Sequence, residues 1–179
     1  MNMNNARMTG AAVGVAVGLV ICVLVFRWFN KDKSILTKYD EMQEKVRGKA
    51  YMYGFFAMLI CEALLALLAM GDVKLPADGP LVHFSVIFIG VMVQASYSIW
   101  NNAYKGMNTN VSRFAVFCVI ISLFNFFPAI VAIASGNMLV DGQLQFPFIN
   151  LLCGMMFIII GLEILIKRIV DKTAPDEEE

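Results

Sequence analysis

Five apolar runs, each about as long as a membrane is thick, dominate the pattern of hydrophobic and polar positions along the chain. An α-helix needs about 20 consecutive apolar residues to cross the hydrocarbon core of a bilayer. The pattern therefore predicts an all-α, polytopic membrane helix bundle that forms a single integral membrane domain. No small-residue cleavage site follows the first run, so we interpret it as a span and not as a signal peptide. The five predicted transmembrane helices cover residues 8–29, 50–70, 81–101, 114–135 and 146–166.

Lysine and arginine are distributed unevenly between the loops, and this distribution predicts an orientation. Residues 30–49 carry six of them, residues 101–113 carry two, and residues 167–172 carry three more. The opposite side has only Arg7 and Lys74. Because positively charged loops stay in the cytoplasm, the N-terminus is predicted outside and the C-terminus inside. The acidic tail, residues 173–179, is predicted to be disordered.

Inside the basic loop, apolar side chains recur every three or four residues. Such spacing places them on one helix face and predicts a cytoplasmic amphipathic helix over residues 36–47. Thr37 and Asp40 are the predicted capping pair at its start, and Gly48 is the predicted hinge before the next span. The helix is either a contact surface for the membrane or a partner, or a solvated connector. Its candidate contact residues are Leu36, Tyr39, Met42 and Val46.

Three glycines in the first run have the four-residue spacing that places residues on one helix face. Glycine lets the backbones of two membrane helices approach closely. We therefore predict a helix-packing face here, either within the chain or between subunits. The alternative is that glycine is simply common in spanning helices. The three residues of this face are Gly10, Gly14 and Gly18.

The last four spans form two similar hairpins, joined by turns rich in Gly, Asp and Pro at residues 71–80 and 136–147. Both hairpins are predicted to run from inside to outside and back. They would then be parallel repeats, related by an axis along the membrane normal. The alternative is that common turn chemistry alone produces the similarity.

Polar side chains inside the apolar runs are the candidates for function, because polar groups at membrane depth are unfavourable. Glu62 lies in the middle of the second run, which places it near the bilayer midplane. Asn125 is expected at a similar depth, and Gln94 in the inner half of its span. These three residues form either a polar site that binds a substrate or passes a proton, or hydrogen bonds that fix helix packing. Glu163 is expected to pair with Lys167 at the inner interface.

The composition agrees with a membrane protein and narrows the chemistry. Of the 179 residues, 59% are hydrophobic and 16% are charged, whereas soluble domains carry about 25% charged residues. The net charge is zero, so nothing indicates nucleic-acid binding. The four cysteines lie in four different apolar runs and the chain has one histidine, so neither a metal site nor a cofactor is indicated. The sequence contains no recognisable catalytic motif, although an enzyme acting on lipid is left open.

One stretch before the second span resembles a known group of sequences. Asp40-Glu41-Met42-Gln43, followed by Arg47-Gly48-Lys49, is similar to the pattern Asp-Glu-x-Gln…Arg-Gly-Lys of small uncharacterised bacterial integral membrane proteins. The resemblance covers about a dozen residues. It implies a multi-pass protein of the bacterial inner membrane, and it implies no activity and no site residues.

Two classes of function are compatible with these features. The first is a small transporter, a channel or an accessory transport subunit with a polar site at the midplane. The second is a membrane scaffold, regulator or immunity-type protein that acts through protein contacts at helix 36–47. In either class, the expected partners are the lipid bilayer and further copies of the chain or another membrane protein.

Overall fold

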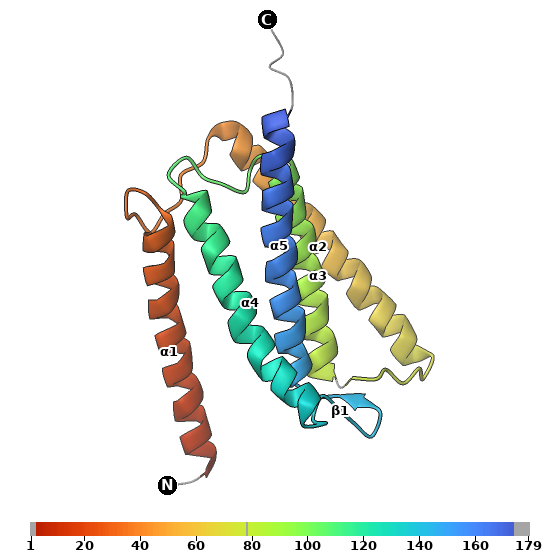
Figure 1. The fold of residues 1–179 in the computed structure, drawn as a ribbon. Coiled ribbons are helices and arrows are strands. Elements are labelled where there is room, and N and C mark those ends of the chain that lie inside the picture. Colours follow the sequence, from red (N-terminus) through yellow and green to blue (C-terminus); the bar gives the residue numbers. More distant parts are fainter. Residues whose placement is uncertain (1–2, 78, 174–179) are drawn as a thin grey trace, which may run out of the picture.

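The computed structural model describes residues 3–77 and 79–173, and five long helices make up most of this part of the chain (Figure 1). Each helix is long and apolar enough to cross a membrane, which confirms the prediction of five spanning helices. The predicted disordered tail falls largely on residues 174–179, outside the described residues. The helices are α1 (Met3–Phe29), α2 (Glu41–Met70), α3 (Gly79–Trp100), α4 (Val111–Ala134) and α5 (Pro147–Thr173).

The helices lie in the spatial order α1, α4, α5, α3, α2 and not in chain order (Figure 1). α2 packs along α3, α4 packs along α5, and α3 packs on α5 to join the two pairs. α1 makes few contacts, mainly with α4. In the apolar stretches of α1 and α2, 6% of the residues are buried, against 22% in α3, α4 and α5. The two outer helices therefore offer most of their surface to whatever surrounds the chain.

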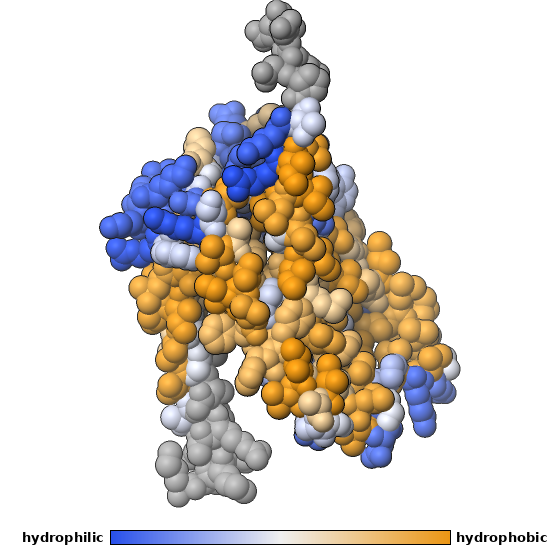
Figure 2. Space-filling model, viewed as in Figure 1, coloured by the Kyte–Doolittle hydropathy of each residue, from blue (hydrophilic) through white to orange (hydrophobic). Residues whose placement is uncertain are grey.

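The core lies where α3, α4 and α5 meet. Three of its residues are spaced by four along α5, so they share one helix face. Outside the core, apolar side chains cover the middle of the molecule and hydrophilic ones gather at its ends (Figure 2). This distribution is typical of helices whose outer surface faces lipid. The buried apolar residues of the core are Ile99, Cys118, Met156, Ile160 and Ile164.

Residues 30–40 and 101–110 are hydrogen-bonded together at one end of the bundle, which we call the basic end. The Asn108 side chain donates to Asp32 Oδ1 and to the Leu36 carbonyl oxygen, each at 3.1 Å. Its own oxygen accepts from the Lys38 N–H at 3.0 Å. The loops approach so closely that a Cβ on Gly106 would lie 2.6 Å from the Lys38 carbonyl oxygen. This network fixes the connection between α1 and α2 against the connection between α3 and α4.

The amphipathic helix predicted over residues 36–47 is not a separate element. Residues 36–40 are irregular, and Asp40 is the N-cap of α2, since its carboxylate accepts from the Gln43 N–H at 2.7 Å. The Gln43 side chain accepts in return from the Asp40 N–H at 3.4 Å, which completes a capping box. The predicted Thr37–Asp40 cap and the Gly48 hinge are therefore wrong. α2 continues through Gly48 because an interior glycine weakens a helix by only about 1 kcal/mol.

The opposite end of the bundle, which we call the hairpin end, contains the α2–α3 turn and the α4–α5 turn. The α4–α5 turn includes a two-stranded hairpin of β1 (Leu139–Val140) and β2 (Gln143–Leu144). Asp141 and Gly142 join its strands with positive φ angles, as a type I′ turn requires. This Asp-Gly pair is the sequence signal for a hairpin that we did not predict. The Leu144 N–H donates to the Pro76 carbonyl oxygen at 2.7 Å, so the two turns pack together.

Candidate functional site

α2 and α3 cross closely because each contributes a glycine at the crossing. A Cβ on Gly54 would lie 2.7 Å from the Gly90 carbonyl oxygen, closer than side-chain carbons normally approach a backbone. Both glycines are buried. Small residues of this kind allow membrane helices to come into backbone contact. Because the two helices run in opposite directions, residues after Gly54 in α2 lie beside residues before Gly90 in α3.

Towards the hairpin end of these two helices, Glu62 of α2 meets His83 of α3. The distance between Glu62 Oε1 and His83 Nδ1 is 2.9 Å. The side chains of His83 and Glu62 are 61% and 43% exposed. They line a cavity of about 400 Å³ together with residues of the α2–α3 turn. The contact is an ion pair if His83 carries the proton and a neutral hydrogen bond if Glu62 carries it.

Glu62 lies closer to the hairpin end of α2 than to its start. Glu62 is eight residues from the end of α2, and His83 is four residues from the start of α3. At about 1.5 Å per residue, Glu62 lies roughly 12 Å from the hairpin end of its helix. The depth of Glu62 in a bilayer stays a prediction, because α2 starts at Glu41 and its first turns carry charged residues that precede the apolar stretch. The carboxyl group belongs to the half of the bundle nearer the α2–α3 turn.

The three polar residues predicted to form one site make no hydrogen bond to one another in the described structure. Asn125 donates from Nδ2 to the Ile121 carbonyl oxygen of its own helix at 2.8 Å. Gln94 lies beside the α2–α3 crossing, where its Cβ would be 3.1 Å from a Cβ on Gly54. Glu62 is paired with His83. A role for Asn125 and Gln94 in a shared site therefore stays a prediction without a hydrogen bond that supports it.

Glu163 has a different partner from the one predicted. Ser96 of α3 donates its hydroxyl to Glu163 Oε1 at 2.8 Å, and Glu163 Oε2 is buried without a hydrogen-bond partner. Lys167, the predicted partner, instead forms an ion pair with Asp171 at 2.6 Å. Glu163 and Asp171 are each four residues from Lys167 and are both possible partners. Glu163 faces α3, whereas Asp171 lies beyond the core. The expected Glu163–Lys167 pair is therefore wrong.

The predicted glycine face of α1 is empty within the chain. A Cβ on Gly14 or on Gly18 would meet nothing within 4 Å. The surroundings of Gly10 lie outside the described residues. The alternative of a contact between helices of one chain is therefore not observed at Gly14 and Gly18. A contact between subunits remains compatible with the structure.

The predicted cytoplasmic contact residues do not share one helix face. Leu36 and Met42 are 76% and 77% exposed, but Leu36 and Tyr39 belong to the loop that precedes α2. The ring of Tyr39 stacks under the Arg47 guanidinium, whose carbon lies 4.0 Å from the ring centroid. Val46 is half-buried. Residues 36–40 are not helical, so the apolar spacing there does not place side chains on one helix face.

In residues 3–77 and 79–173, no group of three or more His, Cys, Asp or Glu side chains could hold a metal ion. The four cysteines are free thiols. The Glu62–His83 pair is therefore the most distinctive polar feature of the helices, and sequence reasoning missed its second member. Comparisons with protein-family models, with curated proteins and with solved structures find no match for this chain.

Proposed function

We propose that the chain is a non-enzymatic subunit of an assembly in the bacterial inner membrane, where it acts as a scaffold or accessory subunit through contacts with its neighbours. The observation that carries the proposal is the exposed Glu62–His83 pair, with side chains 43% and 61% exposed. Polar and ionisable groups that face lipid are unfavourable, and they normally face a neighbouring helix or a water-filled space. A polar surface on a neighbouring subunit would remove this cost.

The arrangement of the outer helices supports the same proposal. α1 and α2 stand at opposite edges of the row of helices, and each packs on one main neighbour (Figure 1). Gly14 and Gly18 leave one side of α1 free for close approach by another helix. The neighbours are further copies of this chain or a different membrane protein.

The proposed orientation has the basic end in the cytoplasm. The loops joined there contain most of the lysines between the spans, and such loops stay on the cytoplasmic side. The N-terminus is then outside and the C-terminus inside, and the α2–α3 and α4–α5 hairpins are proposed as parallel repeats. Single cysteines at positions 33 and 72 test the orientation. Labelling of position 33 from outside intact cells, with position 72 protected, would reverse it.

Crosslinking tests the proposed assembly. Leu64 and Leu67 are 55% and 63% exposed on α2, so a cysteine at either carries a benzophenone probe towards a neighbour. The native cysteines are replaced first. Illumination in native membranes should give a protein adduct from both positions, whereas a probe on Met107, which is 61% exposed in a loop at the basic end, should give much less. Probes on α2 that capture lipid and no protein would refute the proposal.

A transport function is the second candidate, because the cavity of about 400 Å³ beside the α2–α3 turn reaches both Glu62 and His83. A site of this kind could pass a proton or bind a cation. Proteoliposomes with wild type and Glu62→Gln at matched protein levels separate the two functions. Flux in the wild type that is lost in Glu62→Gln, with the α2 crosslinks retained, would favour an accessory transport subunit. Equal flux in both would exclude Glu62 as a charge-carrying group.

A further inference from the structure

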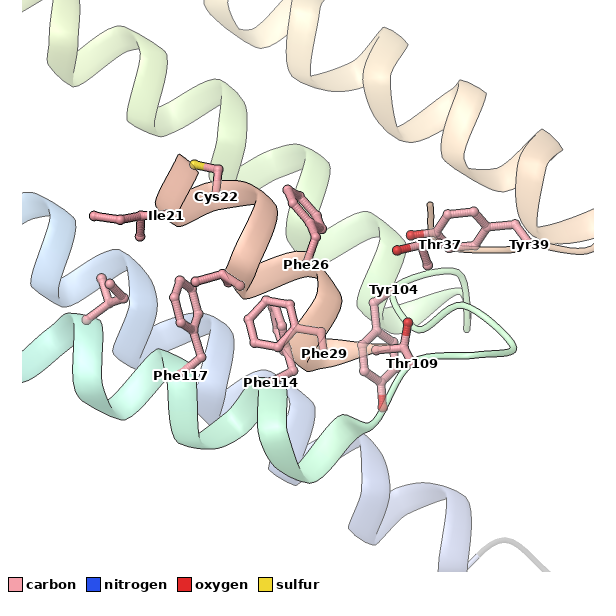
Figure 3. A pocket seen from close by; sticks show the side chains of 12 residues that line it. Ile21, Cys22, Phe26, Phe29, Thr37, Tyr39, Tyr104, Thr109, Phe114 and Phe117 are labelled. Carbon is pink, nitrogen blue, oxygen red and sulfur yellow. The ribbon is translucent and has the colours of Figure 1, made fainter. Parts of the chain in front are cut away.

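A second cavity lies at the other side of the bundle, between α1 and α4, and has a volume of about 440 Å³ (Figure 3). α1 is attached to α4 at the basic end, where the Asn110 N–H donates to the Phe29 carbonyl oxygen at 2.8 Å. Arg113 also donates to the Trp28 carbonyl oxygen, at 2.9 Å. Because α1 makes few other contacts, these bonds hold its end in place while the cavity separates it from α4.

The two ends of this cavity differ in chemistry. Its walls within the helices are apolar and include Val25 and Phe26 of α1 and Phe117 and Ile121 of α4. Figure 3 shows that the hydroxyl-bearing side chains come from the loops at the basic end, away from Ile21 and Cys22. The cavity therefore suits a ligand with an apolar tail and a polar head. The residues with hydroxyl groups are Thr37, Tyr39, Tyr104 and Thr109.

Positive charge accompanies the polar end. The Arg47 guanidinium stacks on the Tyr39 ring at 4.0 Å and donates to the Tyr51 hydroxyl at 3.0 Å. Burial raises the pKa of Tyr104. Arg168 lies near enough to lower that pKa, and Asp171 lies near enough to raise it. Lys167 is paired with Asp171 at 2.6 Å and offsets its charge. In the described structure, Arg47 and Arg168 have no carboxylate partner, so both are available to an anion bound at the polar end.

We propose that this cavity binds one anionic phospholipid of the cytoplasmic leaflet. An acyl chain lies between α1 and α4, and the phosphate lies at the hydroxyl-lined end near Arg47 and Arg168. Guanidinium groups recognise phosphate through charge-assisted hydrogen bonds. The cavity volume falls within the range of about 300–1,000 Å³ that is typical of sites for small molecules. The site is independent of the Glu62–His83 pair and of the proposed function.

Native mass spectrometry of the full chain, released from detergent with added phospholipid, tests the site. The probes are phosphatidylglycerol and phosphatidylcholine with identical acyl chains. We expect one bound phospholipid per chain and a preference for phosphatidylglycerol. Since one basic residue near the surface contributes about a fivefold increase in affinity for anionic lipid, Arg47→Gln and Arg168→Gln should each weaken phosphatidylglycerol binding about fivefold. Binding of phosphatidylcholine should weaken less in both variants, because its choline group offsets the charge of its phosphate.

Filling the cavity tests the position of the acyl chain. Ile121→Phe places a larger side chain in the cavity and should reduce the bound fraction of both lipids. Ile120→Phe makes the same substitution one position away, on a surface that is 42% exposed and outside the cavity, and is the matched control. Val25→Phe fills the cavity from α1 and confirms the effect if Ile121→Phe unfolds, as checked by circular dichroism. The proposal would be overturned by equal lipid binding in Val25→Phe and Ile120→Phe, or by equal binding of the two lipids by the wild type. A dimer of the chain that binds no lipid would also overturn it.

Discussion

Replacing Gly54 by alanine should loosen the contact between α2 and α3. A Cβ there would lie 2.7 Å from the Gly90 carbonyl oxygen and 3.1 Å from Gln94 Cβ, whereas ordinary contact begins at 3.4 Å. The nearer obstacle is backbone, which cannot rotate away, so the helices have to separate by several tenths of an ångström. Overpacking of this kind costs about 1–3 kcal/mol. Because α3 is the main packing partner of α2, no other helix offsets the loss.

The same substitution at Gly48 is the control. Gly48 is also in α2, but a Cβ on it would meet nothing within 4 Å. Both substitutions gain the same helix propensity, about 1 kcal/mol in a helix interior, so their difference measures the contact at the crossing. Unfolding by sodium dodecyl sulfate in mixed micelles, followed by circular dichroism, gives the two free energies. Equal free energies of unfolding for Gly54→Ala and Gly48→Ala would show that the two helices do not meet at Gly54.

Three further predictions concern the loops and the core. Asn108→Ala removes three hydrogen bonds at the basic end; it should destabilise the loops by about 1–3 kcal/mol and speed limited proteolysis of residues 30–40, and an unchanged cleavage rate would contradict it. Ser96→Ala removes the hydroxyl that donates to Glu163 and should cost about 0.6 kcal/mol in detergent unfolding; a stabilised variant would show that the bond is absent. A hydrogen bond from Lys38 lowers the pKa of Asp32 below its ordinary value of 3.8. The loop contact is therefore fully present above that value and weakens as the pH falls below it. The protection of the amides in residues 30–40, measured against their intrinsic exchange rates, should fall in acid, and Asp32→Asn should remove this dependence on pH.

The five helices follow from the sequence alone, because the length of an apolar run is visible in the sequence and determines whether a helix can cross the bilayer. The same holds for the polar turns and for the charge distribution from which the orientation is proposed. The start of α2 required more than periodicity. Apolar residues recurred from Leu36 onward, but the Asp40–Gln43 capping box starts the helix after them. Periodic spacing shows which residues would share a face, and not whether the helix reaches them.

The tertiary structure alone decided which helices are neighbours. Glu62 meets His83 across 21 residues of chain, and Ser96 meets Glu163 across 67. Neither pairing can be read from spacing, because each depends on which helices touch and on how each is rotated about its axis. The glycine patterns illustrate the reason. Gly14 and Gly18 have the regular spacing but no neighbour, whereas Gly54 and Gly90 lie on different helices and make the close crossing. Contact between helices is a property of two surfaces together, and one helix sequence describes only one of them.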